Sequence, residues 1–141
     1  VKELMTTEKL LVVNPVERLV KARADMLNAG FSGMPVVDGT RVVGLLTEKM
    51  VAEAMARFSV EVPDKHRANQ VRQMRVVDAM ALQPPLVSPE DSIAVAATKM
   101  LESGLNTIPV VGDGNRLVGI ISATDFTRFA AHKFRVSGQD E

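Results

Sequence analysis

The amino-acid sequence contains two copies of one pattern. Gly30–Val37 reads Gly-Phe-Ser-Gly-Met-Pro-Val-Val, and Gly104–Val111, seventy-four residues later, reads Gly-Leu-Asn-Thr-Ile-Pro-Val-Val. An Asp-Gly pair follows each copy, at Asp38-Gly39 and Asp113-Gly114, and Gly112 is a one-residue insertion in the second. A period of this length is too long for one unit of a solenoid. It predicts two small domains of one design that pack against each other.

Composition narrows the class of protein. The chain has 141 residues, 46% of them hydrophobic, which suits about one domain core, so we expect the halves to need each other. Seventeen basic and seventeen acidic residues give a net charge of zero, which argues against a nucleic-acid partner. Cysteine is absent and His66 and His132 lie far apart, so we expect no disulfide, catalytic thiol or metal site.

Membrane and enzyme functions are also disfavoured. Apolar runs are short and interrupted by charges, and no basic and then apolar leader opens the sequence, so a soluble, cytoplasmic chain is expected. The first residue is Val1 and not methionine, as in a piece of a longer protein. Gly112, Gly114 and Gly119 lack the spacing of a dinucleotide fingerprint. Since no Ser-His-Asp order or pair of carboxylates at strand ends is visible, we expect a binding module that requires no cofactor.

Turn residues and periodicity predict a β-α-β-β-α order in each half, a mixed α/β (α+β) fold. Asn14-Pro15 and Ser88-Pro89 predict helix starts, and the glycines at 30 and 104 predict helix ends. Asp-Gly between apolar runs predicts a hairpin in each copy. The expected elements are strand 10–13, a helix from Asn14-Pro15 to about residue 29, hairpin 36–46 and helix 47–57, then strand 86–87, helix 88–103, a hairpin around 113–114 and helix 122–131.

This order divides the chain into four parts. Residues 1–57 and 76–131 are the two expected domains, and 58–75 connects them as a loop followed by a helix. Residues 132–141 lack periodicity and are expected to form a frayed polar tail.

The pattern closely resembles a tandem pair of cystathionine-β-synthase (CBS) domains, the Bateman module. The resemblance is carried by Val-x-x-x-Met at Val1–Met5 and Val76–Met80, by the two Gly-x-x-x-x-Pro-Val-Val segments, and by the hairpin ends Gly44–Thr47 and Gly119–Ser122. It implies that the repeats pack sheet to sheet about a pseudo-twofold axis, and that two pairs form a disc-shaped homodimer. It also implies the sensing of adenosine-containing ligands in clefts between the halves.

The strongest chemical motif is Ser122–Asp125, where the second hairpin turns into the last helix. A helix N-terminus with hydroxyls at Ser122 and Thr124 can bind phosphate. A carboxylate at Asp125 can accept hydrogen bonds from both ribose hydroxyls. From these four residues alone an ordinary capping box, Ser-x-x-Asp, is the favoured interpretation, and the two roles are compatible. The resemblance implies phosphate and ribose binding at Ser122 and Asp125.

By the implied pseudo-symmetry, a ligand held by Asp125 also touches the first half. Leu11 and Phe31 offer apolar walls, although core packing is an alternative role for both. Ile120 faces the base, and Gly33 lets backbone approach the ligand. The expected lining of this Asp125 cleft is Thr6, Thr7, Leu11, Phe31, Ser32, Gly33, Ile120, Ser122, Thr124 and Asp125.

The equivalent Met50 cleft departs from the pattern. Thr47 keeps the hydroxyl, but Met50 stands in the aspartate position, and a thioether is a poor acceptor for ribose hydroxyls. We therefore predict one good nucleotide site per chain and one degenerate cleft. The residues expected around the degenerate cleft are Thr47, Lys49, Met50, Met80, Pro85, Leu105, Asn106 and Thr107.

The favoured function is a regulatory module that binds an adenine nucleotide, senses energy or metabolite state, and shifts the arrangement of its domains or dimer. AMP or ADP is expected before ATP, since a polyphosphate needs cations such as Arg116 or Arg128, or basic residues of the connector or a partner chain. S-adenosylmethionine is an alternative ligand. Two other functions stay open: a ligand-free dimerisation or docking module of a larger transporter, channel or enzyme, and divalent-cation sensing by Glu48, Glu53 and Asp64.

Overall fold

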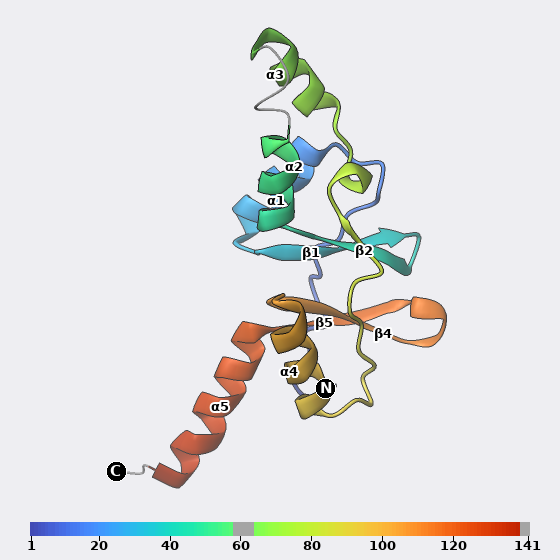
Figure 1. Cartoon of the computed structure of the whole chain (residues 1–141). Helices are drawn as coiled ribbons and strands as arrows, with labels where there is room; N and C mark the ends of the chain where they lie inside the picture. Colours follow the sequence, from blue (N-terminus) through green and yellow to red (C-terminus); the bar gives the residue numbers. More distant parts are fainter. Residues whose placement is uncertain (58–63, 139–141) are drawn as a thin grey trace.

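Two antiparallel sheets face each other across the middle of the molecule (Figure 1). The computed structural model describes residues 1–57 and 64–138. The first half contains α1 (Leu19–Ala29), β1 (Gly33–Asp38), β2 (Arg41–Thr47), α2 (Glu48–Ala56) and β3 (Ala81–Leu82). The second contains α4 (Ile93–Ser103), β4 (Thr107–Val111), β5 (Leu117–Ser122) and α5 (Ala123–Gly138). The expected α/β fold with two repeats packed sheet to sheet is confirmed.

The two hairpins share one register. Gly33 pairs with Thr47 in β1–β2, and Thr107 pairs with Ser122 in β4–β5. Each hairpin has an irregularity at the same place, between Val36 and Val37 in one and between Val110 and Val111 in the other. The two hairpins therefore repeat in backbone structure as well as in sequence.

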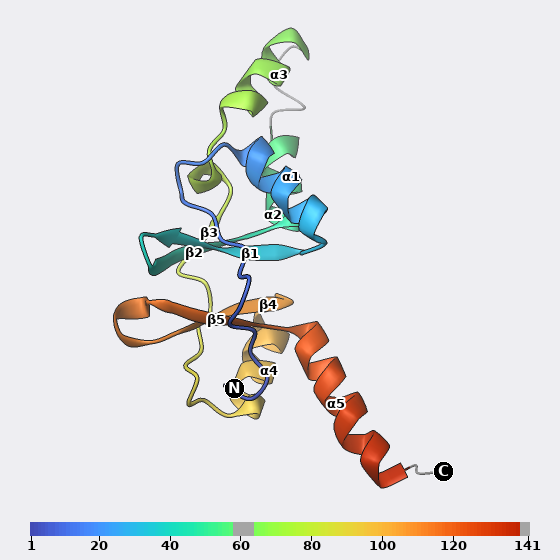
Figure 2. The same cartoon turned by 180° about the vertical axis from the view of Figure 1, so that it is seen from behind.

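The leading segment of each copy lies against the sheet of the other half. Thr6 and Ile120 exchange two backbone hydrogen bonds of 2.8 and 2.9 Å, and β3 pairs with β2 at Leu45 and Gly44. Figure 2 shows the N-terminal trace beginning beside α4 and running into the first half. Backbone pairing of each leading segment with the sheet of the other half thus joins the two halves.

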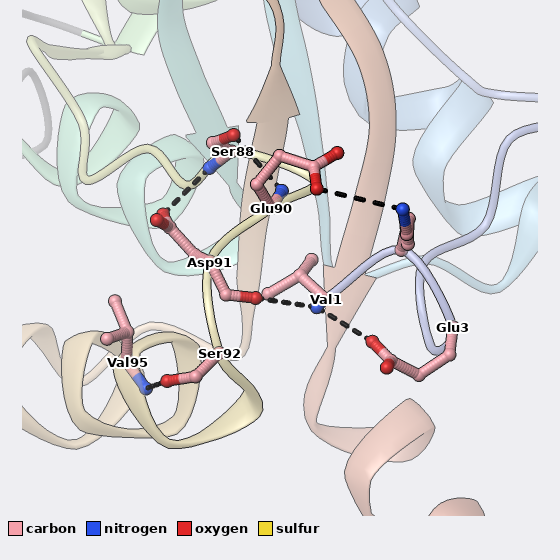
Figure 3. A network of polar contacts seen from close by, with 8 residues as sticks. Val1, Glu3, Ser88, Glu90, Asp91, Ser92 and Val95 are labelled. Atoms are coloured by element: carbon pink, nitrogen blue, oxygen red, sulfur yellow. Dashed lines mark hydrogen bonds and ion pairs between the residues drawn. The ribbon is translucent and has the colours of Figure 1, made fainter.

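Each leading segment also contributes residues to the hydrophobic core of the other half. Val1 is buried in the second-half core with Leu4 and Met5 packed around it, and Val76 is buried in the first-half core. The backbone N–H of Lys2 donates to Pro89 O at 3.1 Å. Close by, the Val1 nitrogen contacts the Asp91 carbonyl oxygen at 2.7 Å (Figure 3). The first residues of the chain thus belong to the second half in space.

Two predicted helix starts are wrong by about one turn. The Asn14 side chain accepts a hydrogen bond from Val16 N, and α1 begins only at Leu19. The Ser88 hydroxyl likewise accepts from Glu90 N, and Ser92 caps α4 instead. Short polar side chains that hydrogen-bond to the backbone two residues on close a turn of their own, which delays the helix.

Other predicted elements differ in extent. The strands expected at 10–13 and 86–87 are reduced to single parallel bridges, Val13 with Val36 and Val87 with Val110. The prediction of a frayed tail is wrong for residues 132–138, because α5 continues to Gly138. In this part of α5 the Lys133 ammonium lies 5.6 Å from the ring centre of Phe129, one helical turn earlier in the chain.

The connector forms α3 (Asp64–Gln73), and a 3-10 turn at Val76–Asp78 opens the second repeat. The loop expected at its start falls on 58–63, outside the described residues. Within 1–57 and 64–138, no helix is long and apolar enough to cross a membrane.

Candidate functional site

A cavity of about 360 Å³ lies between the halves at the start of α5, within the size range of small-molecule sites. It brings together nine of the ten residues predicted for the Asp125 cleft, all except Thr7. The predicted residues that line it are Thr6, Leu11, Phe31, Ser32, Gly33, Ile120, Ser122, Thr124 and Asp125. Five further lining residues are Lys9, Leu10, Gly30, Thr107 and Arg128.

The N-terminal segment that pairs with β5 forms one wall of the cleft. Its pairing with Ile120 places Thr6 beside β5, while the turn after α1 supplies the opposite wall. Ser32 is held there because its carbonyl oxygen accepts from Glu48 N at 3.0 Å. At Gly33 a Cβ would lie 3.3 Å from Thr47 Cγ2, so glycine keeps this wall close to its neighbour strand. The cleft is thus formed by both halves together.

Asp125 is only 8% exposed and its two carboxylate oxygens have different partners. Oδ2 accepts from the Ser122 backbone N–H at 2.8 Å and from the Ser122 hydroxyl at 3.0 Å. Oδ1 pairs with Arg128 Nη1 at 3.3 Å. The carboxylate therefore caps α5 and also lines the cleft, so the capping role and a ligand role are compatible here.

The structure bears on core packing, the alternative role of Phe31 and Leu11. Phe31 is 47% exposed and lines the cavity, so it is not a core residue. Leu11 is half-buried, packs against the first-half core and also lines the cavity. An apolar surface for a planar ring is therefore available beside the polar end at Asp125.

Two cations also line the cleft: Arg128, which was expected only as a candidate cation for a polyphosphate, and Lys9, which was not expected there. Arg128 follows Asp125 by three residues, a spacing that places two side chains on one helix face and was an available signal. Lys9 lies in a turn with a left-handed φ of 56°, and Gln83, at the matching place in the second copy, has a φ of 51°. The sequence around Lys9 contains no glycine, so a left-handed turn was not predicted there.

The residues predicted for the Met50 cleft are divided among several surroundings. The Thr47 hydroxyl accepts from Met50 N at 3.2 Å, and Met50 and Met80 pack against the first-half core. Thr107 lines the Asp125 cleft, while Leu105 and Asn106 line a separate groove between α4 and α5. Lys49 is exposed and Pro85 is half-buried. The predicted residues are thus spread over the first-half core, the Asp125 cleft, the groove between α4 and α5, and the surface.

Arg116 and Arg75, two of the other basic residues considered for a polyphosphate, do not line the cleft. Arg75 donates to Val16 O and Arg18 donates to Arg72 O, so these contacts join the connector to the start of α1. The backbones of Arg116 and Arg41 pair in an isolated antiparallel β-bridge. In the described parts of the chain, no three histidine, aspartate or glutamate side chains are grouped to hold a metal ion, and the side chain of Asp64 lies outside them.

Sequence comparison identifies the family of this chain. A family model described as CBS domain matches residues 1–57 and 76–132. The chain belongs to the CBS domain family and is a tandem CBS pair, which confirms the resemblance.

One curated relative is inosine-5'-monophosphate dehydrogenase of Korarchaeum cryptofilum (strain OPF8), which is 26% identical over 131 residues. That match takes in 93% of this chain but only 24% of the dehydrogenase. The chain therefore spans about a quarter of that relative's length.

Solved structures share the fold. CBSX2 from Arabidopsis thaliana, solved in complex with AMP, is 23% identical with a TM-score of 0.80, covering 96% of this chain and 98% of that one. The CBS domain pair of protein MJ0100, solved with 5'-methylthioadenosine and S-adenosyl-L-methionine, is 20% identical with a TM-score of 0.77, covering 94% and 96%. These likenesses show a shared CBS-pair fold.

Proposed function

We propose that this CBS pair is a regulatory module, working in the cytoplasm, that binds an adenine nucleotide or a related adenosyl ligand in the Asp125 cleft. The observation that carries the proposal is Asp125, a buried carboxylate that lines a 360 Å³ cavity between the halves. The bound AMP in one pair of this fold, and the adenosyl ligands in another, support the ligand class.

The cleft supplies a distinct contact for each part of an adenosine ligand. Phe31 and Leu11 offer apolar surface for the base, and Asp125 accepts from the ribose hydroxyls. Ser122 and Thr124, at the start of α5, suit a phosphate because the first N–H groups of a helix have no intrahelical acceptor.

Regulation follows from the position of the cleft between the halves. A ligand there contacts the turn after α1 and the start of α5 at once, so it bridges the two repeats. It shifts their arrangement, or that of a dimer, only if its affinity differs between two arrangements. We propose that this shift, and not catalysis, is the output by which the module reports energy or metabolite state.

Calorimetric titration of the purified chain with AMP, ADP, ATP and S-adenosylmethionine tests the proposal. We expect micromolar binding near one site per chain, with AMP or ADP before ATP, and loss of binding in Asp125→Ala. Since this variant also loses a helix cap, Ser92→Ala is the matched control, because Ser92 caps α4 and does not line the cavity. No heat with any ligand would reject the nucleotide proposal in favour of a ligand-free docking module.

The proposal includes a homodimer. The groove between α4 and α5, about 490 Å³, is lined by apolar side chains that include Met100, Leu105 and Phe126. Leu101, which also lines the groove, is 85% exposed, and exposed apolar patches often mark protein contacts. A second copy of this face is the partner we propose, as in most symmetric oligomers. Analytical sedimentation should give the mass of a dimer for the parent chain and the mass of a monomer for Leu101→Glu. Equal masses for the two proteins would show that this face is not the dimer interface.

A further inference from the structure

We propose that Arg128 and Lys9 make the Asp125 cleft selective for a phosphorylated adenosine over neutral or cationic adenosyl ligands. This inference rests on the proposed function and adds to it the class of ligand. It begins with the charges of the cavity. The described lining contains two cations, Lys9 and Arg128, and one anion, Asp125, which leaves a surplus of one positive charge.

Arg128 retains donor groups that a ligand can use. A guanidinium has five N–H donors, and the ion pair with Asp125 Oδ1 uses Nη1 at 3.3 Å, longer than a strong charge-assisted bond. The Arg128 side chain is 72% exposed, so no packing holds it in this position. When a ribose hydroxyl takes the place of Nη1 at Asp125, the guanidinium can turn to a phosphate without leaving the cleft.

Lys9 supplies the second cation from the opposite half. It is exposed, and among the described residues it makes no ion pair. Its left-handed backbone is shared with Gln83 in the second copy, so the turn is a property of the repeat. The positive charge at this turn is therefore specific to the first copy.

The matching positions of the other copy have a different charge. Aligned on the hairpin ends, Arg128 corresponds to Glu53 and Asp125 to Met50, while Lys9 corresponds to Gln83 in the alignment of the earlier segments. Because both copies keep the same backbone with different charges, the cations are not needed to build a CBS repeat. This difference favours a role in ligand choice over a role in folding.

Phosphate is the chemistry that this charge pattern fits. A phosphate monoester carries about −1.5 to −2 charges at pH 7, and a guanidinium can bind two of its oxygens at once. Methylthioadenosine has no charge to meet the cations. S-adenosylmethionine carries a sulfonium and an ammonium against one carboxylate, and its net positive charge is unfavourable beside two cations. The cleft should therefore prefer AMP to adenosine, methylthioadenosine and S-adenosylmethionine.

Calorimetry with these four ligands tests the inference on the full chain. We expect AMP to bind at least about tenfold more tightly than adenosine, and Arg128→Gln to weaken AMP roughly ten- to a hundredfold. Lys9→Gln should weaken AMP less, because an exposed ammonium is strongly hydrated. Adenosine affinity should change far less than AMP affinity in both variants. Glu53→Gln, which alters the matching position of the other copy, is the control and should bind AMP like the parent chain.

The failures of the two proposals are distinguishable. If AMP and adenosine bind equally, if Arg128→Gln weakens both alike, or if S-adenosylmethionine binds more tightly than AMP, the phosphate inference is overturned while nucleoside binding stands. If none of the four ligands binds, the phosphate inference falls, and the proposed function falls with it if ADP and ATP also give no heat. Salt offers an independent readout, since added salt should weaken AMP binding and leave adenosine binding unchanged.

Discussion

The starts of α2 and α5 are the same piece of structure with different side chains. Both follow the second strand of a hairpin in the same register, and both have a hydroxyl residue just before the helix, Thr47 or Ser122. In the first copy the Thr47 hydroxyl accepts from Met50 N, whereas in the second the Asp125 carboxylate accepts from Ser122. The fold therefore needs a cap at each helix start, and only one copy uses an acid that also lines a cavity.

The leading segments show the opposite case, in which both copies keep the same chemistry. A Cβ at Gly44 would lie 2.9 Å from Ala81 O, and one at Gly119 would lie 2.9 Å from Thr6 O. Met80 and Met5 pack over these glycines in matching positions. Contacts that join the halves are thus symmetric, while contacts that line the cleft are not.

The largest expected effect comes from copying the first-copy residue into the second. Asp125→Met should weaken AMP binding by a hundredfold or more, because two hydrogen bonds to a charged acceptor, each worth about 1.5–3 kcal/mol, are lost. Titration calorimetry measures it, with the unfolding midpoint checked in parallel. Met50→Leu, an apolar change at the matching position, should leave AMP affinity unaltered. Retention of tight binding in Asp125→Met would show that the asymmetry of the two helix starts is irrelevant to the ligand.

The symmetric contacts should respond symmetrically. Gly44→Ala and Gly119→Ala should each lower the free energy of unfolding by about 1–3 kcal/mol, since a methyl group at 2.9 Å from a backbone oxygen forces the leading segment away. Urea unfolding measures both. Gly112→Ala is the control, because its Cβ would meet only Val118 Cγ1, at an ordinary 3.5 Å. Loss of stability in one variant alone would argue that the segments are not equivalent.

A smaller effect is expected at the cap of α2. Thr47→Ala should cost about 0.5–2 kcal/mol of stability, the usual range for loss of an N-cap hydroxyl. Thermal unfolding measures the change, and AMP affinity should stay the same. Thr47→Ser, which keeps the acceptor oxygen, should recover most of the stability. A parallel loss of AMP affinity in Thr47→Ala would mean that the two helix starts are coupled.

Local signals account for what was predicted correctly. Asp-Gly pairs predicted both hairpins, and Gly30 and Gly104 end α1 and α4 in the left-handed conformation expected of helix C-termini. Asn14 and Ser88 misled the helix starts, because a short polar side chain can close a turn or cap a helix and the sequence does not distinguish the two.

The candidate site divides in the same way. Ser122 and Asp125 were visible because a motif and the family resemblance both place them at a helix start. Arg128 and Lys9 belong to no motif, and their place in the cleft depends on how α5 and the N-terminal segment are oriented in space. Leu105 and Asn106 were assigned by symmetry to a cleft, but the structure places them in the groove between α4 and α5.

The sequence by itself determined the repeat, the hairpins, the CBS family and the asymmetry between Asp125 and Met50, since each depends on neighbouring residues or on comparison of the two copies. Only the tertiary structure decided that Val1–Met5 packs in the second half and Val76 in the first, and that Lys9 and Arg128 share one cleft. The physical reason is that two nearly equivalent sheets offer each leading segment nearly equivalent edges. Long-range packing, which no local pattern records, selects between them.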